Sequence, residues 1–398
     1  MTEPRVLREL LLDTKDGDWG AEAPRDGLVK LRVVRGTDFQ SLALGDPTSV
    51  PTRYITMASA NRRTLRLNDI LLETAGGSRD RPTGRTMLVT QRVMSALGGP
   101  ATCASFARFL RPDPDKVDAE FLFWYLRCGY ATGEMASFQV QHTGVARFHY
   151  TTFAATFKLE LPNRATQRAI AEVLGALDDK IAANALVIRQ TDRLRRLLYE
   201  EMLDSHELPL SELAGFVNGR AFTKDASGTG RVVIRIAELN SGIGGSTVYN
   251  DIDVPDENLA RAGDLLFAWS GTLTAHRWFR PEGIVNQHIF KVIPKTGWPL
   301  WLVACALDRK LDDFKAIAAD KATTMGHIQR RHLDEPVPVP TLQVIHAHNA
   351  AMSALWSRAL AAEIESEQLA TLRDTLLPHL MSGRLTVRDA EARVEAAL

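Results

Sequence analysis

Short runs of alternating hydrophobic and polar residues fill two long stretches of the chain, and glycine-rich segments separate these runs. Alternation with a period of two predicts strands that are buried on one face. The predicted strands cover residues 29–34, 70–73, 87–89, 232–236, 265–269 and 288–293. Amphipathic helices are expected late in each stretch, over residues 119–128 and 299–311. The pattern therefore predicts two globular domains of mixed strand and helix.

A different pattern follows each globular stretch. Apolar residues recur there at alternating steps of four and three, which is the spacing of a heptad stripe. A second stripe repeats the first at an offset of 178 residues, and a proline precedes each one, Pro162 and Pro340. The shared offset favours two helices that pair as an antiparallel coiled coil; two unrelated surface helices are the alternative. The residues expected to form this spacer and its partner-binding surface are Ile170, Leu174, Leu177, Ile181, Ile188, Met352, Leu355, Leu369 and Leu376.

The two globular stretches are related by an internal repeat. Residues 67–72 align with 262–267 at an offset of 195, and residues 7–10 align with 210–213 at 203. We also align Val89-Thr90-Gln91 with Val285-Asn286-Gln287 at 196, and Leu161-Pro162 with Val339-Pro340 at 178. The drift in offset indicates about 17 extra residues in the first copy, between its residue 72 and Leu161. The chain is thus a duplicated unit of globular domain and helix.

Together these patterns predict an α+β fold in which two duplicated globular domains are joined by an antiparallel two-helix coiled-coil spacer. The first globular domain is expected over residues 1–160 and the second over residues 208–338. The spacer helices are expected over residues 161–207 and 339–385, followed by a C-terminal tail over residues 386–398.

Composition places the chain among ordinary globular proteins. Of 398 residues, 48 are Lys or Arg and 48 are Asp or Glu, so the net charge is zero and gives no general preference for nucleic acid. Three distant cysteines exclude a disulfide framework and a four-thiolate zinc site. No apolar run is long enough to cross a membrane, and the first residues do not read as a signal peptide. We expect a cytoplasmic protein without a membrane partner.

Motifs for catalysis are missing from the sequence. It contains no phosphate-binding loop, no dinucleotide fingerprint, no nucleophile elbow and no zinc-protease pattern. Asp178-Asp179 followed by Lys180 resembles a fragment of a nuclease site, but it lies on the predicted spacer helix and reads as a solvated face. We therefore expect no catalytic residues and no metal site.

Polar, arginine-containing loops follow the predicted strands in both copies. Arg, Gln and Thr side chains of this kind read base edges in the major groove and grip phosphates. Seven arginines between residues 62 and 92 add positive charge to the first copy. The candidate DNA-binding residues are Arg79, Arg81, Arg85, Thr143 and Arg147 in the first copy, and Arg277, Gln329 and Arg330 in the second.

At this point the whole chain resembles the specificity subunit of type I restriction–modification systems, which alternates two recognition domains with two helical spacers. The motifs that carry the resemblance are Gly263-Asp264-Leu265-Leu266-Phe267-Ala268, Val285-Asn286-Gln287-His288, Thr324-Met325-Gly326-His327-Ile328, and Leu161-Pro162 followed by Gln167-Arg168-Ala169-Ile170-Ala171. The chain departs from the family where Asn68 replaces a glycine, Thr90 an asparagine and Ile345 a glutamine. These departures affect only local contacts.

The resemblance implies a non-catalytic subunit. Each target-recognition domain would read one half of a bipartite site in double-stranded DNA. The helices would set the length of the unread gap between the two halves and would dock two methyltransferase subunits. Those partners would carry S-adenosylmethionine and methylate adenine at N6. Motor-nuclease subunits would bring ATP and Mg²⁺ for restriction. Two alternatives from other classes are a DNA-processing enzyme such as a nuclease, with an unrecognised site, and a coiled-coil scaffold that binds only proteins.

Overall fold

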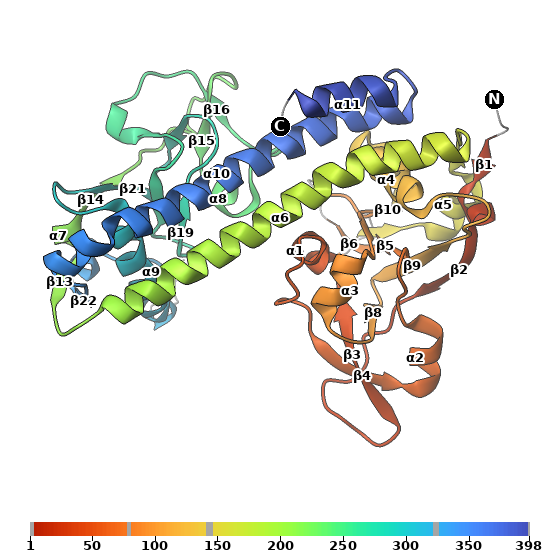
Figure 1. Cartoon of the computed structure of the whole chain (residues 1–398), viewed down its shortest axis with the longest axis horizontal. Coiled ribbons are helices and arrows are strands. Elements are labelled where there is room, and N and C mark those ends of the chain that lie inside the picture. The colour runs from red at the N-terminus through yellow and green to blue at the C-terminus, as the bar shows by residue number, and fades with distance from the viewer. Residues whose placement is uncertain (1–3, 78–80, 141–145, 321–325, 397–398) are drawn as a thin grey trace. The chain divides into compact units, whose positions relative to one another are not determined.

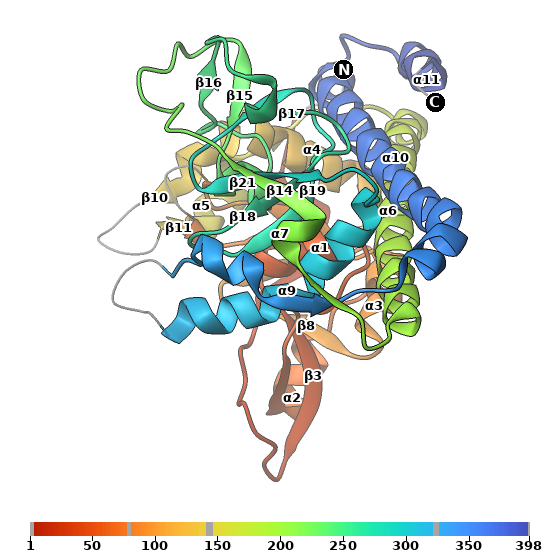
Figure 2. The same ribbon diagram turned by 90° about the vertical axis from the view of Figure 1, so that its left-hand side faces the viewer.

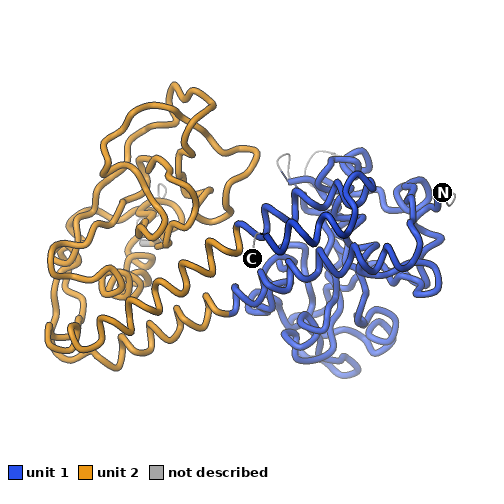
Figure 3. The backbone as a smooth tube through the Cα atoms, turned by 45° about the horizontal axis from the view of Figure 1, so that its top comes forward, with its two compact units in different colours: residues 1–186, 368–398 blue, residues 187–367 orange. Residues whose placement is uncertain are grey.

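The computed structural model describes residues 4–77, 81–140, 146–320 and 326–396 (Figure 1). The chain divides into two compact units, residues 1–186 with 368–398 and residues 187–367, which we call unit 1 and unit 2 (Figure 3). The division falls within two long helices, α6 (Arg164–Met202) and α10 (Leu342–Met381). Each unit therefore contains one globular domain and a segment of both long helices.

Two sheets form the framework of unit 1, and their strands pair antiparallel except for one parallel pair in the second sheet. The first has the order β2 (Leu11–Asp16), β9 (Ala107–Pro112), β5 (Ile70–Glu73) and β7 (Thr86–Leu88), and the second has the order β4 (Thr52–Thr56), β3 (Leu28–Val34) and β8 (Ala101–Cys103). Smaller pairings join β1 (Arg5–Val6) to β12 (Lys158–Leu159), and β11 (Ala146–Phe148) to β10 (Gln139–Val140) and β6 (Ala75–Gly77). The helices of this unit, besides its parts of α6 and α10, are α1 (Phe39–Ala43), α2 (Met57–Arg63), α3 (Gln91–Leu97), α4 (Ala119–Ala131), α5 (Tyr150–Thr156) and α11 (Val387–Glu395).

The main core of unit 1 lies between the first sheet and the long helices. Helix α4 begins where the Asp118 carboxylate accepts a hydrogen bond from the Phe121 amide, an N-cap that satisfies a free donor of the first turn. Its apolar side chains then pack with Leu174 of α6 and Leu376 of α10, both fully buried. Helix α11 covers the same core, and its Ala390 is fully buried. The C-terminal segment expected as a tail thus includes a packed helix.

Unit 2 repeats this plan with different lengths. One sheet has the order β14 (Ala214–Asn218), β21 (Ile289–Pro294), β18 (Leu265–Ala268) and β19 (Thr274–Arg277), and Figure 2 labels its four strands. The other has the order β16 (Tyr249–Asn250), β15 (Arg231–Ile234), β20 (Gly283–Val285) and β17 (Leu259–Ala260), and β13 (Glu207–Pro209) pairs with β22 (Pro336–Pro338). Its helices, besides its parts of α6 and α10, are α7 (Leu210–Leu213), α8 (Ile236–Ser241) and α9 (Leu300–Asp320). The core gathers Phe267, Trp301, Met352 and Trp356.

The two long helices run antiparallel within each unit. In unit 1 the beginning of α6 packs with the end of α10, and in unit 2 the end of α6 packs with the beginning of α10. The predicted stripe forms these contacts: Ile170, Leu174, Leu177, Leu369, Leu376 and Met352 are buried, and Ile181 and Leu355 are partly buried against the cores, while Ile188 is partly exposed. The α+β class and the antiparallel helices predicted from the sequence are confirmed.

Equivalent backbone contacts demonstrate the duplication. In unit 1 the Asp69 carboxylate accepts a bond from the Arg66 amide, and in unit 2 Asp264 does the same for Arg261, at 2.7 and 2.8 Å. The residue before each aspartate has a positive φ, 68° at Asn68 and 101° at Gly263. The predicted alignment at offset 195 therefore holds in three dimensions, and Asn68 replaces glycine because asparagine tolerates this backbone region.

One predicted alignment is wrong. Strand β20, which ends at Val285, pairs in parallel with β15, and the strand of unit 1 in this position is β8, which ends at Cys103. Val285-Asn286-Gln287 is therefore equivalent to Cys103-Ala104-Ser105, at an offset of 182, and not to Val89-Thr90-Gln91. The cause is α3, which unit 1 inserts between β7 and β8. The segment that contains α3 adds seven residues to the first copy relative to the second, and the connection between β5 and β7 adds six more.

Among the described residues, no helix has the length and apolar character that crossing a membrane requires.

Candidate nucleic-acid interface

In unit 1, three chain segments meet at the end of β5. The Thr74 amide donates to the Phe106 carbonyl and the Thr74 carbonyl accepts from the Phe148 amide, both at 2.8 Å. A cavity of about 290 Å³ opens beside them. We call the side chains at this place platform 1, namely Thr74, Phe106, Arg108, Arg147, His149 and Tyr150. Arg147 and His149 are exposed, so platform 1 presents hydrogen-bond donors to solvent.

Arg108 is the fixed cation of platform 1. Its guanidinium lies 4.1 Å from the centre of the Tyr150 ring, pairs with Asp16 at 2.7 Å and donates to the Thr14 hydroxyl. Burial raises the pKa of Tyr150, so the phenol stays neutral at physiological pH. With Arg147 close by, the cavity carries more basic than acidic groups, which favours an anionic or hydrogen-bond-accepting ligand.

Unit 2 has the same backbone arrangement at the end of β18. The Trp269 amide donates to the His288 carbonyl and the Trp269 carbonyl accepts from the Ile328 amide, both at 3.2 Å. By these bonds Trp269 is equivalent to Thr74, His288 to Phe106 and Ile328 to Phe148. Platform 2 accordingly consists of Trp269, His288, Phe290, His327, Gln329 and Arg330.

Platform 2 is more aromatic than platform 1. The Trp269 ring lies 5.9 Å from His288 and 6.3 Å from His327, centre to centre. The indole nitrogen donates to the Asn218 side chain at 2.9 Å, which fixes the ring. Gln329 and Arg330 are exposed beside it. The arrangement offers both flat surfaces and hydrogen-bonding groups, the combination that proteins use on bases and phosphates.

Each platform contains a guanidinium over an aromatic ring, but with the two partners exchanged. In unit 1 the arginine is Arg108 on β9 and the ring is Tyr150. In unit 2 the ring is Phe290 on β21, equivalent to Arg108, and the cation is Arg330, equivalent to Tyr150, 5.6 Å from the ring centre. Both platforms thus contain a guanidinium–ring pair, but strand β9 supplies the cation in unit 1, whereas a 3-10 helix, Arg330–Asp334, supplies it in unit 2.

The structure places three of the eight predicted DNA-binding residues on these platforms, namely Arg147, Gln329 and Arg330. Arg81 is exposed outside them, before Pro82. Arg79 and Thr143 lie outside the described residues. That these residues contact DNA stays a prediction.

Arg85 has a structural environment. Its side chain is 18% exposed, and the guanidinium donates to both carboxylate oxygens of Glu73 at 2.6 and 2.9 Å and to the Gly36 carbonyl. These contacts fix the end of β5 to the loop that precedes α1. We therefore leave Arg85 out of the proposed interface.

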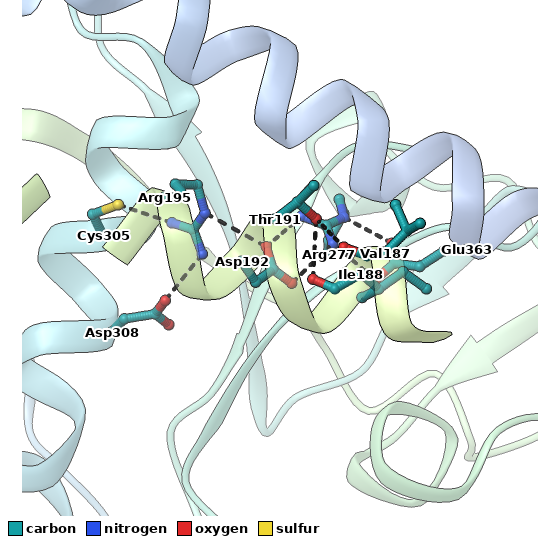
Figure 4. Close-up of polar contacts among 9 residues, drawn as sticks. All are labelled: Val187, Ile188, Thr191, Asp192, Arg195, Arg277, Cys305, Asp308 and Glu363. Atoms are coloured by element: carbon teal, nitrogen blue, oxygen red, sulfur yellow. Dashed lines mark hydrogen bonds and ion pairs between the residues drawn. The ribbon is translucent and has the colours of Figure 1, made fainter. Parts of the chain in front are cut away.

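Arg277 is also held inside its unit, as Figure 4 shows. Its side chain is 4% exposed, its guanidinium donates to Glu363 of α10 at 2.7 and 2.9 Å and to Asp192 of α6, and it stacks over Trp356. Arg195 lies one turn after Asp192 on α6, and its guanidinium donates to the Cys305 sulfur and pairs with Asp308 (Figure 4). Burial raises the pKa of Cys305 to about 12, so this thiol stays protonated. Arg277 serves to attach β19 to the long helices, and we leave it out as well.

Sequence reasoning missed Phe106, Arg108, Tyr150, Trp269 and His288. No common spacing in the sequence locates Phe106 and His288, which follow Gly17 and Gly219 by 89 and 69 residues. Their equivalence appears in the structure, where a Cβ on either glycine would collide with the carbonyl of Cys103 or Val285, three residues before Phe106 or His288. Among the described residues, no group of His, Cys, Asp and Glu could hold a metal ion.

Comparisons with known proteins identify the fold. No family model matches the sequence, and no curated protein matches it. A crystal structure of a type I restriction–modification system S subunit from M. genitalium is similar to this chain, with a TM-score of 0.54 and 16% sequence identity. The match covers 95% of this chain and 95% of the M. genitalium chain. The chain has the fold of a type I S subunit. The resemblance inferred from sequence motifs is confirmed at the level of fold.

Two further structures match at the same 16% identity but with lower TM-scores. An HsdS subunit from Thermoanaerobacter tengcongensis covers 96% of this chain and 97% of its own at 0.35. A chain from work on complex assembly and conformational transition of the type I R-M system covers 96% and 98% at 0.37.

Proposed function

We propose that the chain is the DNA sequence-recognition subunit of a type I restriction–modification complex. The observation that carries this proposal is the duplicated platform, which occurs once in each unit of an S-subunit fold at equivalent backbone positions. Platforms 1 and 2 share a backbone and differ in side chains, as expected of two surfaces that read different sequences. Unit 1 would read one half of a bipartite site in double-stranded DNA and unit 2 the other half.

The chemistry belongs to partner subunits in this proposal. Two methyltransferase subunits would supply S-adenosylmethionine and methylate adenine at N6, and motor-nuclease subunits would supply ATP- and Mg²⁺-dependent cleavage. This chain would be non-catalytic and act in the cytoplasm. The domain division stays part of the proposal, with recognition domains at residues 1–160 and 208–338 and spacer helices at 161–207 and 339–385.

Docking of the methyltransferase subunits needs residues other than the stripe predicted from the sequence. Most of that stripe is buried inside the units and is closed to a partner. The outer face of α6 in unit 2 exposes Leu194 and Leu197 at 45% and 52% of their surface. Leucines exposed three residues apart on one helix face fit a partner surface. We assign the docking of one methyltransferase subunit to this face.

The decisive experiment is methylation-aware sequencing of DNA from cells that express this chain with its methyltransferase partner. One bipartite motif with adenine methylation in each half supports the proposal. Replacing residues 1–158 by those of a relative is expected to change one half and preserve the other half and the gap. A change in both halves would contradict independent reading by the two units.

The gap itself tests the role of the helices. Four residues inserted near Asn184 lengthen α6 by about 6 Å and add about one turn, so the apolar stripe keeps its face. The gap is expected to grow by one or two base pairs, at about 3.4 Å per pair. Two inserted residues rotate the stripe by about 200° and are expected to abolish activity. An active four-residue variant with an unchanged gap would refute the proposal that the helices set the distance between the two half-sites.

The alternatives predict different results with the purified chain. A nuclease would cleave DNA without partners, whereas the recognition subunit leaves DNA intact. A scaffold that binds only proteins would give a complex without affinity for DNA. Neither alternative has a feature among the described residues that favours it.

A further inference from the structure

Phe106 is an exposed aromatic side chain on platform 1. It lies in the short connection between β8 and β9, and 60% of its surface is exposed. A phenylalanine in this state buries too little area to contribute much to folding. Its large apolar surface, in a polar surrounding, is available to a ligand.

The backbone holds Phe106 in a fixed position. Its carbonyl accepts hydrogen bonds from the amides of Thr74 and Ala75, at 2.8 and 3.3 Å. The following amide, of Ala107, donates to the Ala104 carbonyl at 2.8 Å and closes a tight turn. Side chains presented from a rigid turn lose little entropy when they bind, which suits a residue that distinguishes ligands.

The neighbours of Phe106 point to nucleic acid as the ligand. Thr74 is hydrogen-bonded to Phe106, and it also lines the cavity together with Arg108, Arg147 and His149. Basic and hydrogen-bond-donating groups around one apolar side chain fit a duplex, where phosphates and base edges accept hydrogen bonds and apolar groups are rare.

Unit 2 has His288 at the equivalent position. The His288 ring is partly exposed, and its Nε2 forms a hydrogen bond with the side-chain Nε2 of Gln287 at 3.2 Å. Two copies of one backbone thus present an apolar ring in one case and a hydrogen-bonding ring in the other. A difference of this kind is expected at a position that contacts bases.

We propose that Phe106 reads thymine in the half-site bound by unit 1, by packing against the C5-methyl group in the major groove. This inference rests on the proposed function. The thymine methyl is the apolar group on the major-groove edge of the base pairs, and phenylalanine is one of the side chains that contact it. Phe106 is therefore a specificity-determining residue, and His288 serves a different base by hydrogen bonding.

The test uses the full chain in complex with its methyltransferase subunits, and duplexes in which deoxyuridine replaces each thymine of the mapped motif in turn. Uracil lacks only the methyl group. Binding is measured by competition at one fixed salt concentration. One substitution in the half-site of unit 1 is expected to weaken binding about 4-fold, the effect of one methyl-sized group leaving a buried contact.

The Phe106→Ala variant supplies the second arm. This variant is expected to bind the thymine duplex more weakly than the wild type does. It is expected to bind the thymine and uracil duplexes with equal affinity, so that the methyl group no longer matters. Leu67→Ala is the matched control, because Leu67 is 51% exposed at the other end of β5. It is expected to retain the thymine preference, as is His288→Ala in the half-site of unit 1.

Four results would overturn the inference. Phe106→Ala could keep the preference for thymine over uracil, or no thymine of the first half-site could show a methyl effect in the wild type. Loss of methyltransferase subunits from the Phe106→Ala complex, with DNA discrimination intact, would make Phe106 a protein-docking residue instead. A wild-type complex that does not prefer its motif over a scrambled duplex would refute the proposed function, and this inference with it.

Discussion

Unit 1 and unit 2 share the contacts that shape their backbones and differ in the side chains that those backbones present. Arg35 binds Asp38 and the Ser49 carbonyl, and Arg235 binds Glu238 and the Ser246 carbonyl in the same geometry. In contrast, the platforms have no identical side chain at the equivalent positions. The comparison indicates that duplication preserved a hydrogen-bonded frame and left the presented surface free to vary.

A second difference lies where each unit packs on the long helices. Leu88 pairs with Ile70 across β7 and β5, and in the same register Arg277 pairs with Leu265 across β19 and β18. Leu88 is part of an apolar core, whereas Arg277 is bound by Glu363 and Asp192. One unit thus uses apolar packing, and the other uses an ion cluster, for the same junction.

The first prediction removes the cation from that cluster. Arg277→Leu leaves Glu363 buried without its partner, and is expected to lower the free energy of unfolding of unit 2 by about 3–5 kcal/mol. Chemical denaturation followed by tryptophan fluorescence measures the loss, because Trp278, Trp301 and Trp356 report on this unit.

The double variant Arg277→Leu with Glu363→Ala is the control, since it installs the residues found in unit 1, where Ala185 is the helical equivalent of Glu363. It is expected to recover most of the lost stability, because well-packed apolar residues replace a buried ion pair at little cost. Equal stabilities of the single variant and the wild type would show that the cluster is not coupled to folding.

The second prediction exchanges side chains between the platforms. Arg147→His with His149→Gln gives unit 1 the residues that unit 2 has at His327 and Gln329. The exchange is expected to change the first half of the methylated motif and to preserve the second half, with a cost of about 1–3 kcal/mol for each base contact that is lost. Methylation-aware sequencing reads the result. A motif that changes in both halves would show that the platforms do not act separately.

The sequence predicts the frame well because the frame leaves local signals. An aspartate after a residue suited to positive φ, as in Asn68-Asp69 and Gly263-Asp264, marks the start of β5 and of β18 in both copies. The heptad stripe likewise locates α6 and α10, since its period is a property of the helix alone.

The platforms leave no such signal. Strands β8 and β20 share no identical residue at equivalent positions, and contacts visible in the structure, such as their parallel pairing with β3 and β15, relate them. The burial of Arg277 could not be predicted from the sequence either, because its partner Glu363 is 86 residues away along the chain. Exposure of an arginine depends on such distant partners, so polar loops alone gave a mixture of surface and structural residues.

The third prediction tests the exchanged cation–ring pairs. Arg108→Phe removes a guanidinium from Tyr150 and is expected to destabilise unit 1 by about 1–2 kcal/mol, within the range of a partly buried cation–π contact. Adding Tyr150→Arg recreates the arrangement of Phe290 and Arg330. Urea unfolding of both single variants and the double variant forms a double-mutant cycle. Recovery of about half of the loss is expected, and strict additivity would mean that the two arrangements are not equivalent.

The smallest effect is expected at the residue before the aspartate that both units share, Asp69 and Asp264. Asn68 has a φ of 68°, inside the left-handed region that asparagine tolerates, so Asn68→Gly is expected to change the free energy of unfolding by less than about 0.5 kcal/mol. Gly263 has a φ of 101°, and a Cβ there would lie 3.3 Å from a methyl carbon of Leu360. Gly263→Asn is therefore expected to cost about 1 kcal/mol, from backbone strain and crowding together. Thermal unfolding of the two reciprocal variants measures both values. If the two substitutions had the same effect, the frames would be equally permissive at this turn, and the choice of asparagine in one unit and glycine in the other would carry no structural meaning.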